Sequence, residues 1–401
     1  MSSEKKQLSK RRRRWFQLRL RTLLVLVTLA SGVFGWVGWE LEQRRREKVA
    51  IAWVEKLGGK VYFETRIDSG FKTNWWKKTK DTLFGENVTQ ISLMDTQVSD
   101  LTPLAGMENL LDLDLIETKV SDLSPLAGLK NLRSLRLNQT EVSDLSPLAG
   151  LKNLEFLFLE KLKVDDLSPL AELKNLGRLG LNNSPVSDLT PLAGMENLQG
   201  LDLNGTAVSD LTALAGMENL VDLDLNETKV SDLSPLAGLK NLRDLRLNQT
   251  EVSDLSPLAG LSNLGWLGLD NTPVSDLTPL AGMEYIGVLN LNGTAVSDLT
   301  GLVGMSLGKL NLEGTEVSDL TPLAGMEYMI ELNLNGTEVS DLTGLVGISL
   351  LNLNLEGTEV SDLTPLASME DLERLYLGGT NVTEEQIEQL QLALPNCKIS
   401  R

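Results

Sequence analysis

The chain has 401 residues, of which 42 % are hydrophobic but only 4 % aromatic, and its formal net charge is −18. Because it contains no histidine and a single cysteine, Cys397, Ser-His-Asp and Cys-His catalytic groups, intramolecular disulfides and Cys/His zinc sites are excluded. Residues 1–86 hold 20 Lys and Arg against 9 Asp and Glu, whereas the remaining 17 basic and 46 acidic residues give a charge of −29 that argues against nucleic-acid binding.

The N-terminal segment combines a basic stretch with an apolar one. Nine Lys and Arg lie within residues 1–21, and an uncharged run rich in Leu and Val follows from Thr22 to Trp39. These 18 residues are just enough for a helix to span a bilayer. The positive charge before the run predicts a cytoplasmic N-terminus and places the rest of the chain outside. A cleaved signal peptide is the alternative, because Ala30-Ser31-Gly32 supplies small residues.

Residues 40–86 are predicted to connect this anchor to the rest of the chain. Residues 40–57 have a helical pattern that ends at Gly58-Gly59, and residues 60–63 are typical of a short strand. An amphipathic helix is predicted from Thr73 to Leu83, where it would cover the open end of the following repeats. Its Trp75-Trp76 pair is interpreted as part of that cap, with a binding anchor as the alternative.

From residue 87 the chain repeats one unit, typified by Val120-Ser121-Asp122-Leu123-Ser124-Pro125-Leu126-Ala127-Gly128. The valines that mark the successive units are Val98, Val120, Val142, Val164, Val186, Val208, Val230, Val252, Val274, Val296, Val317, Val339, Val360 and Val382. Most steps are 22 residues, with two of 21 residues after Val296. A fixed period in the twenties predicts a solenoid, here of about 14 coils, in which each coil covers its neighbour.

Each unit divides into a strand and a tight turn. Leucines alternate with polar residues over residues 112–115, which predicts a strand with one buried face. After the strand, Ser124 is expected to cap and Pro125 to open a single helical turn. The aspartate that precedes each turn, as at Asp122, is expected to accept backbone N–H bonds, with cation binding by the aspartate ladder as the alternative.

The full unit, Asn-Leu-x-x-Leu-x-Leu-x-x-Thr-x-Val-Ser-Asp-Leu-Ser/Thr-Pro-Leu-Ala-Gly, resembles the short 22-residue leucine-rich repeats of bacterial internalins across residues 87–382. The resemblance implies an α/β solenoid in the form of a leucine-rich-repeat arc. Its parallel sheet lies on the concave side, where relatives bind their ligands, and short helical turns lie on the convex side. This chain has Thr where the family usually has Asn, so a threonine ladder must satisfy the bend of each coil. Leu162 interrupts the ladder, and we expect an irregular coil there.

Two blocks of the repeat, residues 107–150 and 217–260, are nearly identical and lie five coils apart. After such faithful copying, the differences between copies are more informative than the shared residues. Most solvent-facing strand positions are Asp, Asn, Gly or Ser, but three aromatic residues and three arginines differ from this background. These candidate partner-binding residues of the concave face are Arg136, Phe156, Phe158, Arg178, Arg246 and Trp266. Such residues are enriched in binding hot spots; packing across neighbouring side chains is the alternative.

Residues 383–401 are predicted to cap the last coil. A capping box at Thr383-Glu384-Glu385-Gln386 opens a helix that runs to about Leu394, and Pro395 ends it. Cys397 is interpreted as a small core residue and not as a reactive thiol. The ending at residues 394–399 resembles those of membrane-anchored bacterial leucine-rich-repeat proteins.

The predicted organisation is a basic cytoplasmic segment (1–21), a transmembrane anchor (22–39), a juxtamembrane helix and N-terminal cap (40–86), a repeat domain (87–382) and a C-terminal cap (383–401). The predicted function is that of a non-enzymatic, single-pass membrane protein whose repeats bind a protein partner in the periplasm or outside the cell. No cofactor, metal ion or nucleic acid is expected. A cell-wall glycan as the ligand, and a rigid acidic spacer of the envelope without a ligand, are the alternatives.

Overall fold

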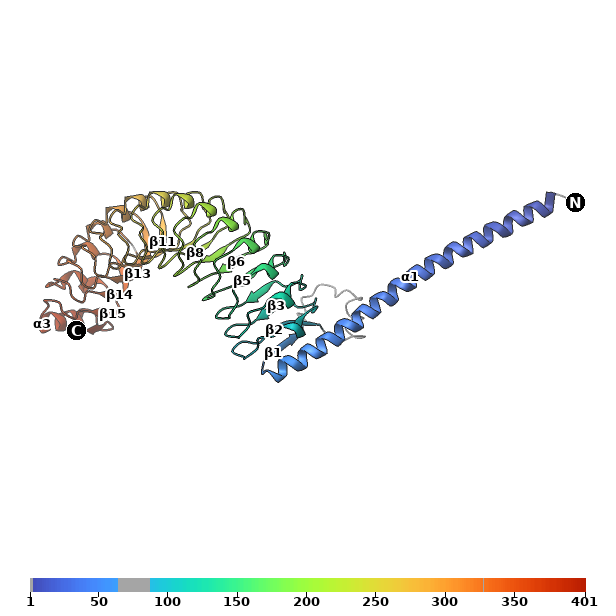
Figure 1. The fold of residues 1–401 in the computed structure, drawn as a ribbon. Coiled ribbons are helices and arrows are strands. Elements are labelled where there is room, and N and C mark those ends of the chain that lie inside the picture. The colour runs from blue at the N-terminus through green and yellow to red at the C-terminus, as the bar shows by residue number, and fades with distance from the viewer. Residues whose placement is uncertain (1–2, 64–86, 327) are drawn as a thin grey trace.

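The computed structural model describes residues 3–63, 87–326 and 328–401, the side chains of residues 3–21 and 328 excepted. The chain forms a curved solenoid with a long helix, α1 (Ser3–Lys56), that projects from its N-terminal end (Figure 1). Strands line the inner side of the arc, and short turns lie along its outer side (Figure 1). The predicted leucine-rich-repeat solenoid is confirmed.

One sheet of 16 strands follows the arc in sequence order. Its first pair is antiparallel and all later pairs are parallel. The strands are β1 (Lys60–Phe63), β2 (Val88–Ser92), β3 (Asp112–Asp114), β4 (Ser134–Arg136), β5 (Phe156–Phe158), β6 (Arg178–Gly180), β7 (Gly200–Asp202), β8 (Asp222–Asp224), β9 (Asp244–Arg246), β10 (Trp266–Gly268), β11 (Tyr285–Asn290), β12 (Ser306–Asn311), β13 (Tyr328–Asn333), β14 (Ser349–Asn354), β15 (Arg374–Tyr376) and β16 (Lys398–Ser400). Strands β2–β15 supply one strand to each of the 14 coils.

Leucines from every coil fill one continuous core. The middle residue of β8, Leu223, is in register with Leu201 of β7 and Leu245 of β9, and all three are at most 1 % exposed. Burying each such side chain contributes about 1.5–3 kcal/mol. The cluster extends from Ala50 to Cys397, so that stability comes from contacts between neighbouring coils and not from a single centre.

A hydroxyl, in most coils that of a threonine, closes the bend after the strand. Thr228 donates its Oγ1 hydrogen to the carbonyl of Leu225 at 2.7 Å, next to Glu227, whose φ of 56° is left-handed. Equivalent bonds are made by Thr96, Thr118, Thr140, Ser184, Thr206, Thr250, Thr272, Thr294, Thr315, Thr337, Thr358 and Thr380. The predicted threonine ladder is confirmed.

The prediction of an irregular coil at Leu162 is wrong. Lys161 keeps the left-handed φ of 57° found at this point of other coils. Leu162 is 2 % exposed, because its side chain occupies the buried space that threonine fills elsewhere. The coil therefore loses one hydroxyl bond but keeps its backbone path.

An aspartate begins each outer turn. Asp122 accepts the backbone N–H of Ser124 on Oδ1 at 2.8 Å, and the hydroxyl of Ser124 together with this N–H lowers the pKa of the Asp122 carboxyl. The turn itself is a 3-10 helix, Ser124–Leu126, without a side-chain cap from its N-cap residue. The predicted capping role of Ser124 is therefore wrong, because Ser124 is already the first residue of the 3-10 helix and Leu123 takes the N-cap position. The role predicted for the aspartates is confirmed.

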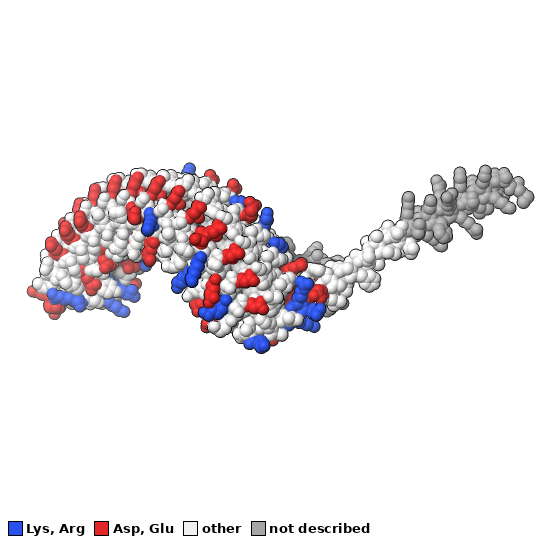
Figure 2. Space-filling view, viewed as in Figure 1, with Lys and Arg blue, Asp and Glu red and all other residues white. Residues whose placement is uncertain are grey.

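The same aspartate bond is made in the other turns. The further acceptors are Asp100, Asp144, Asp166, Asp188, Asp210, Asp232, Asp254, Asp276, Asp298, Asp319, Asp341 and Asp362. These residues form a line along the outer rim of the arc, where Figure 2 shows a row of acidic side chains.

Strands β11–β14 have six residues, whereas those of most earlier coils have three. In the earlier coils an asparagine holds the chain before the strand: Asn241, for example, donates to the carbonyl of Glu218 at 2.8 Å. At the equivalent places the later coils have Tyr285, Ser306, Tyr328 and Ser349. Without the asparagine bond, the backbone pairs directly, as Tyr285 does with Ser306.

The C-terminal part of α1 covers the first coil. Its Ala50 and Val54 are fully buried in the core, and Gly58 ends the helix with a φ of 81°. This confirms the helix predicted for residues 40–57 and the strand predicted for residues 60–63. The helix predicted at Thr73–Leu83, with Trp75-Trp76, lies outside the described residues.

Polar contacts fix α1 on this coil. Arg44 donates to Glu47 at 2.9 Å and to Asn87 at 2.7 Å. Asn109, one coil further on, donates to Glu47 at 3.2 Å. Glu47 is only 4 % exposed, so the helix is held by charged groups shielded from water as well as by its apolar face.

The last coil is closed by α3 (Glu384–Ala393) and β16. Thr383 and Gln386 form the predicted capping box, in which Gln386 N–H donates to Thr383 at 3.3 Å and Thr383 N–H to Gln386 at 2.8 Å. Cys397 is 4 % exposed, and burial raises the pKa of its thiol. Strand β16 adds one more parallel strand beyond the predicted repeats.

We expect Thr228→Val to lower the free energy of unfolding by about 1–2 kcal/mol, because the buried carbonyl of Leu225 loses a hydrogen bond while the side-chain shape is kept. Urea denaturation of the two proteins measures the difference. Ser231→Ala, at an exposed position of the same coil, is the control and should change stability by less than about 0.5 kcal/mol. Equal midpoints for Thr228→Val and the wild type would show that the ladder adds no stability.

Candidate partner-binding face

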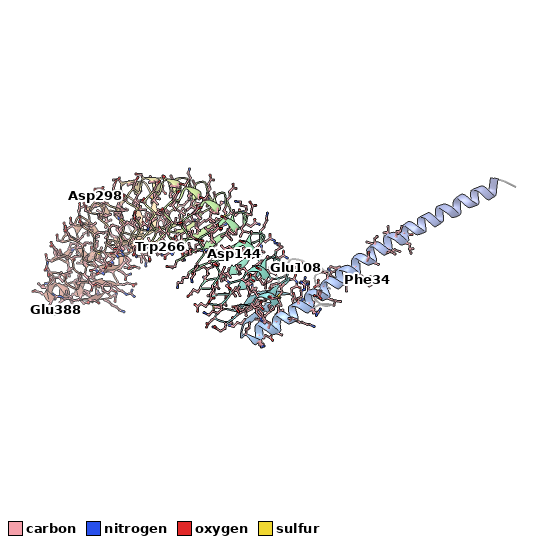
Figure 3. All side chains as sticks on the ribbon, in the orientation of Figure 1. Phe34, Glu108, Asp144, Trp266, Asp298 and Glu388 are labelled. Carbon is pink, nitrogen blue, oxygen red and sulfur yellow. The ribbon has the colours of Figure 1, made fainter. Side chains whose placement is uncertain are left out.

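The first and third residues of each strand line the open face of the sheet, since the middle residue points into the core. All six candidate residues lie on this face. Phe156, Arg178 and Trp266 are first residues, and Arg136, Phe158 and Arg246 are third residues. Figure 3 shows Trp266 on the inner side of the arc, away from Asp298 on the outer turns.

The two phenylalanines of β5 have different environments. Phe156 is 44 % exposed. Phe158 is half-buried between neighbours: the guanidinium of Arg136 lies 5.8 Å from its ring centroid, and a Cβ added to Gly180 would meet its ring at 3.0 Å. Phe158 is thus a platform that holds Arg136 over its face, whereas Phe156 is the open aromatic of the pair.

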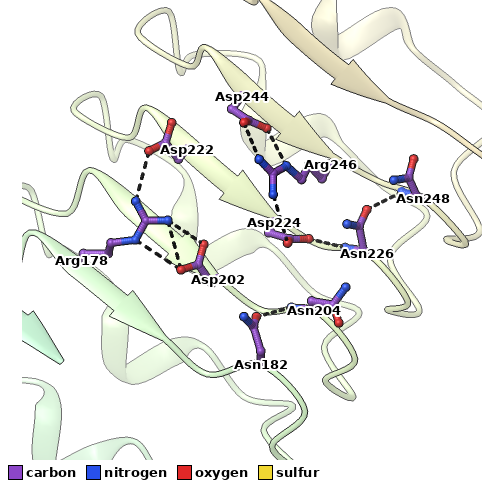
Figure 4. Close-up of polar contacts among 10 residues, drawn as sticks. All are labelled: Arg178, Asn182, Asp202, Asn204, Asp222, Asp224, Asn226, Asp244, Arg246 and Asn248. Atoms are coloured by element: carbon purple, nitrogen blue, oxygen red, sulfur yellow. Dashed lines mark hydrogen bonds and ion pairs between the residues drawn. The ribbon is translucent and has the colours of Figure 1, made fainter. Parts of the chain in front are cut away.

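Arg178 is bound by carboxylates of the next two coils (Figure 4). Its Nη2 lies 3.1 Å and 3.2 Å from the two oxygens of Asp202, and its Nη1 lies 3.4 Å from Asp222. Gly200 makes room for this crossing, since a Cβ there would approach the guanidinium at 3.2 Å. The structure places Arg178 beside Phe156 but directs its charge toward its own chain.

Arg246 is bound in the same manner (Figure 4). It donates to both oxygens of Asp244 at 2.9 Å and 3.1 Å, and its Nη1 lies 3.9 Å from Asp224. The bond to Asp244 raises the pKa of the guanidinium. Trp266 lies under it, 5.6 Å from Cζ to the ring centroid, and is 38 % exposed.

A hollow of about 380 Å³ lies beside Phe156. Its floor is low because Gly177 and Gly200 have no side chains, and polar groups of Gln199 and Asp222 stand around it. A groove of about 440 Å³, lined largely by asparagines, continues from it along the edge of the first coils. Both are open to solvent. The face is therefore an uneven surface that can accommodate side chains of a macromolecule, and not an enclosed pocket for a small molecule.

Three carboxyl groups near the ends of the strands have raised pKa values. Burial is the main cause at Glu160, Asp224 and Asp270. Asp270 also accepts the backbone N–H of Asn292 at 3.0 Å. Within the described part of the chain, no three His, Cys, Asp or Glu residues are grouped so as to hold a metal ion.

Further aromatic residues are exposed on or beside this face, among them Tyr62 of β1, which is 47 % exposed and in register with Gln90 of β2. Tyr376 of β15 is 36 % exposed and occupies the position that Phe158 has on β5, so the same strand pattern could have selected it. Tyr285, 57 % exposed, stands where earlier coils have the turn asparagine. Only the extension of β11 shows that it belongs to a strand.

We expect Asp270→Asn to stabilise the fold at neutral pH. The folded pKa of Asp270 lies above its ordinary 3.8, so above that value the folded state binds more protons than the unfolded state, and the contribution of Asp270 to stability falls as pH rises through the folded pKa. Asparagine removes the buried charge and keeps the acceptor, as Asn248 does in accepting the N–H of Asp270 at 2.8 Å. Urea denaturation at neutral pH and below pH 3.8 should show the gain only at neutral pH.

Asp276→Asn is the matched control, because the hydroxyl of Thr278 lowers the pKa of the Asp276 carboxyl. Its contribution is present above the ordinary pKa and is lost as pH falls through the folded value. This variant should therefore be less stable than the wild type at neutral pH. A loss of stability in Asp270→Asn at neutral pH would contradict the assignment of a burial cost.

Comparison with known proteins supports the architecture. A family model described as Leucine Rich repeats (2 copies) matches residues 130–172. An internalin of Listeria monocytogenes is 26 % identical, with a TM-score of 0.64 over 78 % of this chain and 86 % of its own. A leucine-rich-repeat protein of Leptospira interrogans is 20 % identical, with a TM-score of 0.71 over 77 % and 83 %. No curated protein sequence matches the chain.

A receptor offers a further comparison. The leucine-rich-repeat ectodomain of a plant membrane receptor kinase from Arabidopsis thaliana was solved in complex with CASPARIAN STRIP INTEGRITY FACTOR 2. It is 20 % identical, with a TM-score of 0.66 over 88 % of this chain and 47 % of its own. At this identity the likeness is one of fold. The repeat unit, the 16-stranded sheet and these matches together show that the chain is an internalin-like leucine-rich repeat protein.

Proposed function

We propose that this chain is a non-enzymatic, membrane-anchored protein that binds a protein partner on the open face of its sheet, outside the cytoplasmic membrane. The observation that carries the proposal is the exposure of Phe156 and Trp266, 44 % and 38 %, on a face that is otherwise mostly polar. Covering each ring with a partner is worth up to about 1.5–3 kcal/mol. The open hollow beside Phe156 can accommodate side chains of another macromolecule.

The anchor part of the proposal is supported by α1. Its segment from Thr22 is long and apolar enough to cross a membrane. Leu23, Leu26 and Phe34 are 59 %, 63 % and 76 % exposed, so the described part of the chain leaves this apolar surface uncovered. Lipid is the natural cover for such a surface, and the basic residues before it favour a cytoplasmic N-terminus.

The binding proposal is tested with Phe156→Ala/Phe158→Ala. The purified full chain is used to capture partners from an envelope extract of the native cells. We expect the wild type to retain one protein in near-stoichiometric amount and the double variant to retain at least about tenfold less, as for the loss of hot-spot residues. Val303→Ala, which removes an exposed apolar side chain of an outer turn, is the control and should bind as the wild type does.

Thermal unfolding of the same proteins keeps this test interpretable. The double variant should melt near the wild-type temperature, because residues on the open face fill no core. A melting point several degrees lower together with unchanged capture would show that the two rings are packing residues. Capture of no stoichiometric partner by the wild type would favour the envelope spacer.

The topology is tested in native cells. We expect the protein to remain in the membrane pellet at high pH with its N-terminus intact, because residues 22–39 stay in the bilayer. Protease added outside spheroplasts should digest the repeats. A soluble chain that starts near residues 31–33 would show cleavage, and full protection from protease would reverse the orientation.

A further inference from the structure

The two copied blocks leave different arginines without an ion pair. In the first block, Arg133 binds Glu155 at 2.8 Å, whereas Arg136 has no carboxylate within ion-pair distance among the described residues. In the second block the roles are exchanged. Arg246 binds Asp244, whereas Arg243, the counterpart of Arg133, has no such partner in the described parts of the chain.

Two sequence differences cause this exchange. The residue on β4 that corresponds to Asp244 is Ser134, whose hydroxyl is buried without a hydrogen-bond partner among the described residues. The residue that corresponds to Glu155 is Gly265. Each region therefore has one of the two carboxylates, and a different one in each case, so that each presents one guanidinium without an ion pair among the described residues.

Both unpaired arginines stand next to an exposed aromatic residue. Arg136 of β4 lies over the ring of Phe158, and the exposed Phe156 is on the same strand as Phe158. Arg243 immediately precedes β9, and its carbonyl accepts the N–H of Trp266 on the next coil at 2.9 Å. The side chains of Arg136 and Arg243 are exposed. The Arg136 guanidinium lies at the aromatic pair of β5, whereas Arg243 neighbours Trp266 through its backbone.

We propose that Arg136 and Arg243 are two of the cations that this face offers to its partner, and that the partner is a protein segment with carboxylate side chains next to apolar ones. This inference rests on the proposed function and adds Arg243 to the binding residues. Five coils separate the two sites, about 24 Å at the spacing of neighbouring strands, a distance that an extended segment of roughly seven residues spans.

Charge complementarity favours an acidic segment at these two sites. Residues 87–401 carry a net charge of −29, and Arg178 and Arg246 are already neutralised by Asp202 and Asp244. A carboxylate is therefore repelled along most of the arc and attracted where a guanidinium has no partner. Arginine can bind a carboxylate through two N–H groups at once, which also fixes the orientation of the ligand.

The copies themselves supply the test variants. Ser134→Asp gives Arg136 the carboxylate that Arg246 has, and Gly265→Glu gives Arg243 the one that Arg133 has. A side chain fits at residue 265, since an added Cβ would lie 3.8 Å from the nearest atom, the carbonyl oxygen of Arg243. Neither change removes an arginine or an aromatic ring. Ser231→Asp, which adds the same charge on an exposed outer position, is the control.

The probes are three fluorescein-labelled peptides in which leucine alternates with glutamate, glutamine or lysine. Fluorescence anisotropy with the purified full chain should show the tightest binding for the glutamate peptide, weakening as salt is added. Ser134→Asp and Gly265→Glu should each weaken it about tenfold, as for the loss of one hot-spot contact, while Ser231→Asp leaves it unchanged. The glutamine peptide should not distinguish these variants.

Four results would overturn the inference: no binding of any peptide, no preference for the glutamate peptide over the glutamine peptide, tighter binding of the lysine peptide, or equal effects of Ser134→Asp, Gly265→Glu and Ser231→Asp. The envelope capture separates this failure from failure of the proposed function. A captured partner that is lost in Phe156→Ala/Phe158→Ala but kept in Ser134→Asp and Gly265→Glu would retain the binding function and exclude the role of the two arginines.

Discussion

The structure depends on the parallel pairing of each coil with the next. A strand of three residues such as β8 could not persist alone, but its backbone bonds to β7 and β9, and Leu223 packs on Leu201 and Leu245. The bonds within a coil serve this stacking. The hydroxyl of Thr228 and the carboxylate of Asp232 satisfy backbone groups at the two bends, so neighbouring coils keep matching bends and fit in register.

This stacking also decides which surface residues meet. Residues 22 apart stand side by side, so a charge on one strand has its partner on a neighbouring strand, as Arg178 has in Asp202 and Asp222. In the binding site that we propose, a guanidinium is left unpaired where the position of its partner holds Ser134 or Gly265 instead of a carboxylate.

The sequence predicted the features that lie within one repeat. The coil number, the alternating strand, the threonine ladder and the bond of Asp122 to the following turn all follow from local spacing. What could not be predicted depends on contacts between coils or on where the helical turn begins. Ser124 does not cap because the turn begins at Ser124 itself, with Leu123 at the N-cap position. Leu162 fits because its neighbours enclose it, and β16 forms because β15 offers a free edge. Likewise, the six face residues could be selected from the strand pattern, but which arginines are already bound could not.

The continuous helix α1 links the arc to the proposed anchor. The uncharged run ends at Trp39, and the next residue, Glu40, is already 1 % exposed, so α1 passes from one environment to the other without a linker. Ala50, in the core of the cap, is only about 16 Å further along the helix. With residues 22–39 in a bilayer, the first coil lies at the membrane surface and its position is set by a continuous helix. A partner that binds the open face then meets it at a fixed orientation to the membrane, which a flexible tether would not provide.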